Sequence, residues 1–267
     1  KGRLLRSIAE SWERKILNRF DRVSTISSAM LHRLASKGVD SKSLVLLPNW
    51  VDLDVIRPQQ ATARLENPYR CELDIASDQV VLMYSGSMNK KQGLDLLVDV
   101  IHQLADLPQL VWLLAGDGPT KSELIAATEG LSQVRHMPLQ PMKRLNDWLN
   151  LADIHLLPQK AEAADLVLPS KLLGILASGR PVVACSPAGS ELSALVKYAG
   201  ACVPPGDVNA FAAALRELII SPERRSHAGC QARLLVEERF GIESVLGRFE
   251  QQLLDLVNQG RGDAGVL

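Results

Sequence analysis

The sequence of 267 residues carries no net charge, because 30 lysines and arginines balance 30 aspartates and glutamates. A basic footprint is typical of nucleic-acid-binding proteins, so this balance gives no support to that class. The sequence also lacks any run of about eighteen consecutive apolar residues, which predicts that no helix crosses a membrane. Residues 1–20 are amphipathic and charged, unlike a signal peptide.

Cysteine is scarce: the chain has four, widely separated, and no two of them form a CxxC pair. This spacing predicts neither a disulfide framework nor a zinc site, and we expect reduced thiols in a cytosolic protein. The histidines are equally dispersed. His155 lies in an apolar run, where a packed core residue is the favoured interpretation.

The common nucleotide-binding motifs are absent as well. There is no Walker A sequence, and Gly116-Asp117-Gly118-Pro119 lacks the third glycine of a dinucleotide fingerprint. We therefore interpret this loop as a tight turn before a helix. The helix would start at a capping box formed by Thr120 to Glu123.

Helical periodicity is present from the first residues onward. Apolar positions over 4–19 have helical spacing, with basic residues around the rest of the circumference. A helix docked on protein with a solvated face is the favoured interpretation. Binding to a membrane surface is the alternative.

From residue 80 onward, short apolar strands alternate with helices. Val80–Ser85 is apolar without alternation, as in a strand covered on both faces of a parallel sheet. The predicted strands are 80–85, 110–115, 134–137, 154–157, 181–185 and 201–203; the helices between and after them are 93–104, 120–129, 145–151, 171–178, 191–198, 208–220 and 242–257. The pattern predicts an α/β fold with a doubly wound parallel sheet.

Two loops at the carboxyl edge of this sheet carry lysines where helices are expected to begin. Lys90 and Lys91 precede one helix, and Lys171 lies in the first turn of another, after Ser170 as its N-cap. Cations at a helix N-terminus are unfavourable by a few tenths of a kcal/mol, unless an anion is bound there. Solvated turns are the simpler reading of each loop alone. Together the loops favour a polyanion site, which a nucleoside diphosphate would fit.

These motifs, in this order, resemble the retaining glycosyltransferases of family 4, which have the GT-B fold of two facing Rossmann-like domains. The resemblance covers residues 20–250. The matching segments are 21–52, 84–93, 115–119 and 177–184. Segments within 159–172 resemble the colanic-acid subgroup, whose members act in exopolysaccharide biosynthesis and are assigned as fucosyltransferases. GDP-fucose is therefore a candidate donor.

The resemblance implies a domain organisation. Residues 1–48 would be the tail of an N-terminal acceptor domain, and 49–238 the Rossmann-like domain that binds the nucleotide sugar. Residues 239–258 would form a helix that crosses back to the first domain, and 259–267 a flexible tail. On this basis we expect the acceptor domain to precede Lys1, and the chain alone to bind donor but to transfer sugar poorly.

The resemblance also implies site residues. Those near the donor phosphates would be Gly86, Ser87, Lys91, Ser170 and Lys171. Lys91 and Lys171 would be catalytic, because fixed lysines stabilise a departing diphosphate. Asp165 would hold the donor sugar, and Leu139 and Gln140 would lie near the base. No metal and no cofactor are implied.

The sequence departs from the family pattern at the phosphate and ribose positions. Ser87 stands where the family has arginine, and Gln92 where it has lysine, with Lys91 one position earlier. The family has a motif of two glutamates, and the second of them binds ribose. In this sequence Gly174 stands at the position of the second glutamate, and Asp165 is the carboxylate nearest to the position of the first glutamate.

The implied partners are a GDP- or UDP-linked sugar and a saccharide or lipid-linked acceptor, with peripheral attachment to the inner membrane. Two other functions remain open at this point. A nucleotide-sugar epimerase would release an epimerised sugar without acceptor. A non-catalytic nucleotide-sugar-binding module would bind the donor and leave it unchanged.

Overall fold

The computed structural model describes residues 2–59, 64–163 and 168–264. The chain divides into two compact units. The first unit comprises the residues up to Trp50 and those from Arg239 onward, and the second unit is Val51–Glu238. The roles predicted for these parts of the chain stay predictions.

The first unit contains a small parallel sheet between helices. Its elements are α1 (Gly2–Leu17), β1 (Val23–Thr25), α2 (Ser28–Ser36), β2 (Leu44–Leu46) and α11 (Ile242–Ala264). Strand β1 pairs with β2 in parallel, with Val23 opposite Leu44. The Ser27 side chain accepts a hydrogen bond from the Met30 N–H and so caps α2. Helix α11 continues past its predicted end at Val257.

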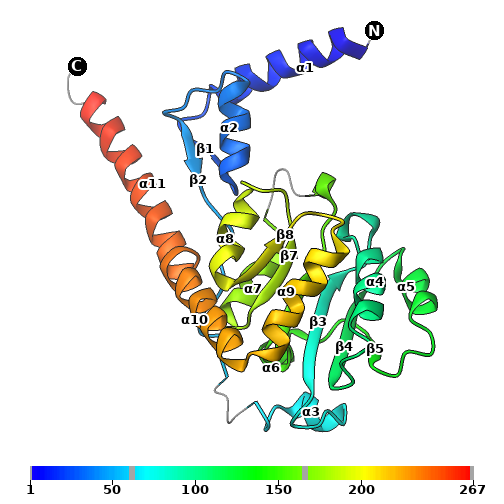
Figure 1. Cartoon of the computed structure of the whole chain (residues 1–267). Helices are drawn as coiled ribbons and strands as arrows, with labels where there is room; N and C mark the ends of the chain where they lie inside the picture. The colour runs from blue at the N-terminus through cyan, green and yellow to red at the C-terminus, as the bar shows by residue number, and fades with distance from the viewer. Residues whose placement is uncertain (1, 60–63, 164–167, 265–267) are drawn as a thin grey trace. The chain divides into compact units, whose positions relative to one another are not determined.

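The second unit is a parallel sheet with helices on both faces (Figure 1). Its strands are β3 (Val80–Ser87), β4 (Leu110–Asp117), β5 (Val134–Met137), β6 (Ile154–Leu157), β7 (Val182–Cys185) and β8 (Gly200–Val203). Its α-helices are α3 (Pro68–Glu72), α4 (Asp95–Gln103), α5 (Lys121–Ala127), α6 (Leu145–Leu151), α7 (Ser170–Ala177), α8 (Glu191–Ala199), α9 (Val208–Ile220) and α10 (Pro222–Arg239), the last residue of which falls in the first unit.

The strand order β5-β4-β3-β6-β7-β8, with every neighbouring pair parallel, confirms the predicted doubly wound sheet. The chain winds outward from β3 to β5, and then returns to β6 and winds the other way. The strand order therefore reverses between β3 and β6, which is where open α/β sheets bind their ligands.

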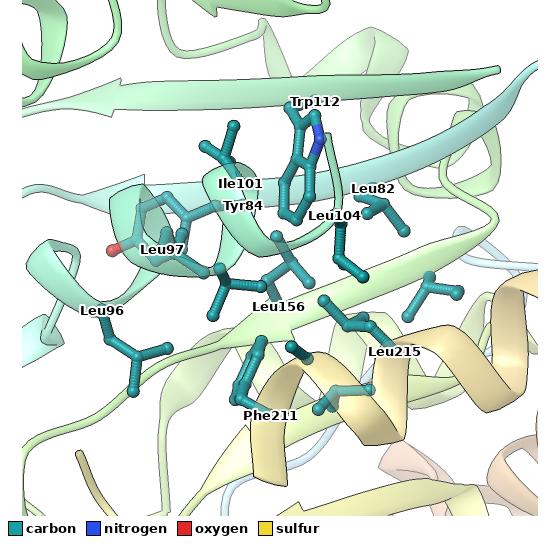
Figure 2. Packing of buried hydrophobic residues seen from close by; sticks show 14 of the residues in the cluster. Leu82, Tyr84, Leu96, Leu97, Ile101, Leu104, Trp112, Leu156, Phe211 and Leu215 are labelled. Carbon is teal, nitrogen blue, oxygen red and sulfur yellow. The ribbon is translucent and has the colours of Figure 1, made fainter. Parts of the chain in front are cut away.

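The first five residues of β3, 80–84, are apolar and buried because both faces of the strand are covered there. Leu82 and Tyr84 pack in one cluster with residues of α4 and α9 (Figure 2). Val81 and Met83 belong to a second cluster, which includes Trp148 of α6. His155 in β6 is buried, as predicted, and burial lowers its pKa to about 4.

The first residues of three helices show whether a side chain caps the helix N-terminus. Asp207 caps α9 by accepting the Ala210 N–H at 2.8 Å, and Ser221 accepts the Arg224 N–H at 3.2 Å where α10 begins. The predicted capping box at Thr120 is wrong. Thr120 makes no side-chain cap hydrogen bond, and its ψ of 2° departs from the extended backbone of a capping residue.

The cap of α9 gives a first prediction. Asp207→Ala should destabilise the fold by about 1 kcal/mol, because it leaves the Ala210 N–H without its acceptor. Asp207→Asn should cost far less, since an asparagine oxygen can accept the same bond. Urea unfolding with an unchanged m-value measures both. Equal losses in the two variants would show that the carboxylate charge, and not the cap, is what matters.

Candidate functional site

The candidate site lies at the carboxyl edge of the sheet, around the reversal between β3 and β6. Gly86 and Ser87 are the last residues of β3, and Ser170 and Lys171 begin α7 after β6. Leu139 and Gln140 follow β5 on the same edge. Because all six strands are parallel, these loops come from one side of the sheet.

Lys171 is the central charged group of this edge. A Cβ placed at Gly86 would lie 3.1 Å from its Nζ, so the structure brings these two predicted residues together. The Nζ atom lies 3.9 Å from the centroid of the Tyr84 ring. It is buried, and no hydrogen-bond partner for it exists among the described residues.

Burial lowers the pKa of Lys171 to about 7, because a charged ammonium loses its hydration there. The tyrosine ring face offsets part of that loss. An ammonium without hydrogen-bond acceptors is costly, and polar groups of this kind are normally paired. An anion beside Gly86 would supply the missing acceptors.

Tyr84 also shapes the loop after β3. Its hydroxyl donates to the backbone carbonyl of Ser87 and lies 3.4 Å from the Gln92 side-chain oxygen. Burial raises the pKa of Tyr84, so it stays a neutral donor. Ser87 itself is exposed at the end of the strand, and its Oγ accepts from the Asn89 side chain at 3.3 Å.

Lys91 has a different setting from the predicted one. The helix predicted over 93–104 is present as α4, but it begins at Asp95 and not at Gly93. Residues 90–92 form a short 3₁₀ helix before it, and Gly93 has a left-handed φ of 64°. Lys91 therefore does not precede the α-helix directly, and the helix-dipole argument does not apply to it. Its side chain is exposed, and its carbonyl accepts the Lys160 N–H at 3.1 Å. Its role at the phosphates stays a prediction.

Ser170 does not cap α7, contrary to the prediction. Pro169 occupies the N-cap position and Ser170 is the first helical residue, exposed at the edge. The helix thus starts one residue earlier than expected, and Lys171 stays within its first turn.

A group of aromatic and charged residues that the sequence did not reveal lies beside Gln140. The Tyr69 hydroxyl donates to Gln140 Oε1 at 2.9 Å. The Arg144 guanidinium lies 3.8 Å over the Tyr69 ring and forms a bidentate pair with Glu72 at 2.9 and 2.6 Å. Leu139 is 59% exposed, so its side chain is accessible next to this anchored amide.

Trp148 connects this group to the end of β3. Its indole N–H donates to Ser85 Oγ at 3.1 Å, and its ring meets Tyr69 edge-on at 5.0 Å. The sequence signal was present, because aromatic residues make up only 4% of the chain and each is conspicuous.

The predicted sugar and ribose positions are less defined. Asp165 lies outside the described residues. Gly174 lies in α7, where an added Cβ would be 3.3 Å from Leu149 Cδ1. The ribose contact implied by the resemblance stays a prediction.

The glycines of 116–119 have a packing role that the sequence did not show. A Cβ at Gly116 would lie 1.9 Å from the Gly86 carbonyl oxygen, and one at Gly118 would lie 2.3 Å from that of Met88. Both glycines have positive φ values, 154° and 149°. The loop after β4 therefore lies directly against the loop after β3 and supports the backbone beside Lys171.

A doubly wound parallel sheet with helices on both faces defines a Rossmann-like domain, and Lys171, which has no acceptor among the described residues, lies at the point where its strand order reverses. Residues 79–221 match the family described as "Glycosyl transferases group 1". This match covers more than half of the chain, and the chain belongs to that family. No helix in the described ranges is long and apolar enough to span a bilayer.

Relatives and solved structures agree with this placement. The chain is 34% identical to WcaI of Escherichia coli K12, assigned as a colanic acid biosynthesis glycosyl transferase, over 93% of this chain and 61% of that protein. It is 30% identical to a D-inositol 3-phosphate glycosyltransferase of Xylanimonas cellulosilytica, over 78% and 50% of the two chains. The chain thus spans about half to three fifths of the length of these relatives.

The Anabaena protein HepE, solved in complex with UDP and glucose, superposes with a TM-score of 0.75 at 17% identity, over 91% of this chain and 66% of HepE. At that identity the likeness concerns the fold. It confirms the predicted Rossmann-like sheet as one of the GT-B glycosyltransferase type.

Proposed function

We propose that this chain binds a nucleotide-activated sugar at the carboxyl edge of its sheet, as part of a glycosyltransferase that moves the sugar to a saccharide or lipid-linked acceptor. The observation that carries the proposal is the Lys171 ammonium, which lies beside Gly86 and has no acceptor in the part of the chain that the structure describes. Membership of the glycosyl transferases group 1 supports it. So does the complex of the structurally similar HepE with UDP and glucose.

In this proposal, Lys171 pairs with the diphosphate and stabilises the negative charge that develops on it as the bond to the sugar breaks. A fixed cation in a site poor in water does this without reorganisation at the moment of reaction. Gly86 allows the phosphates to approach the backbone, and Ser87 and Ser170 present exposed hydroxyls at the same edge. Lys91 adds a second positive charge.

The base of the nucleotide would lie against the loop after β5. Leu139 offers an exposed apolar surface, and Gln140 is held in place by the Tyr69 hydroxyl. Asp165 is proposed to hold the donor sugar, as the family resemblance implies. Transfer would be independent of metal and would retain the anomeric configuration, as in family 4.

The finer assignment follows the relative that acts in colanic acid biosynthesis. We propose a role in exopolysaccharide biosynthesis, with GDP-fucose as the donor, at the cytoplasmic surface of the inner membrane. The direct test is calorimetric titration with GDP, UDP and ADP, each with and without its sugar. We expect GDP and GDP-fucose to bind most tightly. If no nucleoside diphosphate binds, the proposed function fails, and if UDP binds most tightly, only the donor assignment fails.

The pKa of Lys171 gives a pH prediction. Below pH about 7 the ammonium is charged before the donor arrives. Above that pH the lysine must take up a proton to pair with the diphosphate, so affinity should fall as pH rises, by about tenfold per pH unit. Titration with a nucleotide sugar between pH 7.5 and 8.5 measures this, because its diphosphate diester has no proton of its own to lose in that range. An affinity independent of pH would contradict the lowered pKa of Lys171 or its pairing with the diphosphate.

A further inference from the structure

The opposite edge of the same sheet holds a second concentration of positive charge. A pocket of about 450 Å³ opens there, before the starts of β6 and β7. We call it the arginine pocket, lined among others by Arg64, Ser77, Asp153, Arg180, Arg225 and Ser226. All of these residues belong to the second unit.

Asp153, the carboxylate that lines this pocket, already pairs with two arginines. Asp153 is buried, and Arg64 reaches its two oxygens at 2.6 Å each. Arg70, which is itself buried, lies 3.4 Å from the same carboxylate. The Val81 N–H also donates to it at 2.8 Å. The Asp153 carboxylate is therefore already shared by two guanidiniums and a backbone N–H.

Arg180 remains without a carboxylate. Among residues 64–163 and 168–264 no acidic side chain pairs with it, and its closest polar contact is Asn150 Oδ1 at 3.5 Å. Its Nε is buried and makes no hydrogen bond. Residues 60–63, next to the pocket in sequence, contain no acidic side chain that could serve.

Arg225 is the third arginine that lines the arginine pocket, after Arg64 and Arg180. Its Nη1 donates to the carbonyls of Leu218 and Ile219 at the end of α9, at 2.7 Å each. Burial lowers the pKa of Arg180, and the charges of Arg64 and Arg225 lower it further, against the opposing effect of Asp153. Three guanidiniums against one carboxylate leave an excess of two positive charges on the lining.

We propose that the arginine pocket is a second anion site, which takes a small phosphoryl oxyanion such as inorganic phosphate or the phosphate of a phosphomonoester. Guanidiniums match such oxyanions with paired hydrogen bonds, and the Arg180 Nε has no hydrogen-bond partner among the described residues. The pocket begins at the start of α10, where the helix dipole adds to the attraction for an anion. The volume leaves room for an organic group beside the phosphate.

The proposal does not depend on the function proposed for the carboxyl edge, and the two sites can be measured separately. Binding of inorganic phosphate is titrated by calorimetry at constant ionic strength in a Lys171→Met background, which removes the other candidate anion site. Arg180→Gln should weaken phosphate binding at least about tenfold. Arg224→Gln is the control arginine, because Arg224 lies on α10 next to Arg225 but is exposed and pairs with Glu217. The affinity of this variant should stay within about twofold of the background.

The position of the bound anion can be tested with the unsubstituted chain. A crystal of the unsubstituted chain soaked in selenate should show anomalous density beside Arg180. A hexose phosphate in place of inorganic phosphate tells whether the pocket accepts an organic group. Equal losses in the two arginine variants, or selenate at the Lys171 edge alone, would overturn the proposal. If Arg180→Gln fails to fold, the selenate position decides by itself.

Discussion

Replacing Lys171 by methionine should weaken binding of a nucleoside diphosphate by about a hundredfold while leaving the unliganded chain as stable as before, or more stable. The variant keeps an unbranched apolar side chain that is one atom shorter, and it removes the ammonium that lies over the Tyr84 ring. Hydrogen bonds to charged groups contribute about 1.5–3 kcal/mol each, which corresponds to roughly ten- to hundredfold in affinity. The gain in stability is expected because a buried charge without acceptors is removed.

The matched control is Lys197→Met. Lys197 also places its ammonium over a tyrosine ring, 5.6 Å from the centroid of Tyr198, but on the exposed surface of α8. Its loss should change neither affinity nor stability measurably. Calorimetry gives the affinity, and urea unfolding gives the stability. If Lys171→Met unfolds the chain while Lys197→Met does not, Lys171 is a structural residue and the anion-site interpretation fails.

Gly116→Ala is expected to be the most destabilising substitution in the candidate site, by about 3 kcal/mol or more. A methyl group there would lie 1.9 Å from the Gly86 carbonyl oxygen, so the backbone of β3 or β4 must shift. The positive φ of 154° adds strain of about 1–3 kcal/mol for an alanine. The displaced Gly86 should also reduce nucleoside diphosphate binding, because Gly86 lies next to the Lys171 ammonium.

Gly130→Ala separates the two costs. Gly130 also has a positive φ, 79°, but an added Cβ would meet nothing within 4 Å. The free energy of unfolding of this variant should therefore fall only by the backbone strain, about 1 kcal/mol. Its affinity for a nucleoside diphosphate should be unchanged. Unfolding free energies of the two variants, compared with the unsubstituted chain, give the clash by difference. Equal destabilisation by both would show that a side chain at Gly116 does not clash with Gly86 where β3 and β4 end.

The sheet was predictable because its signals are local. A strand covered on both faces is apolar throughout, and Val80–Ser85 has that pattern. The cap at Asp207 could be read in the same way, since the bond joins residues three positions apart. The start of α4 could not be predicted from the sequence, because Gly93 adopts a left-handed backbone conformation and a short turn precedes the helix.

The site was predictable only in part. Lys171 was identified from its place in the first turn of a helix, but its burial depends on Tyr84, which is distant in sequence. The contacts among Tyr69, Gln140 and Arg144 also join residues far apart in the chain. No pattern of spacing in a single sequence can show them, although the scarcity of aromatic residues marked each one.

Tyr84 contributes to two properties of the protein at once. Its ring packs in the buried cluster with α4 and α9 (Figure 2), and the same ring contacts the Lys171 ammonium. A substitution among those core helices that tilts the ring would change the charge state of the site without touching it. The stability of this core and the affinity of the proposed anion site should therefore change together when the ring moves.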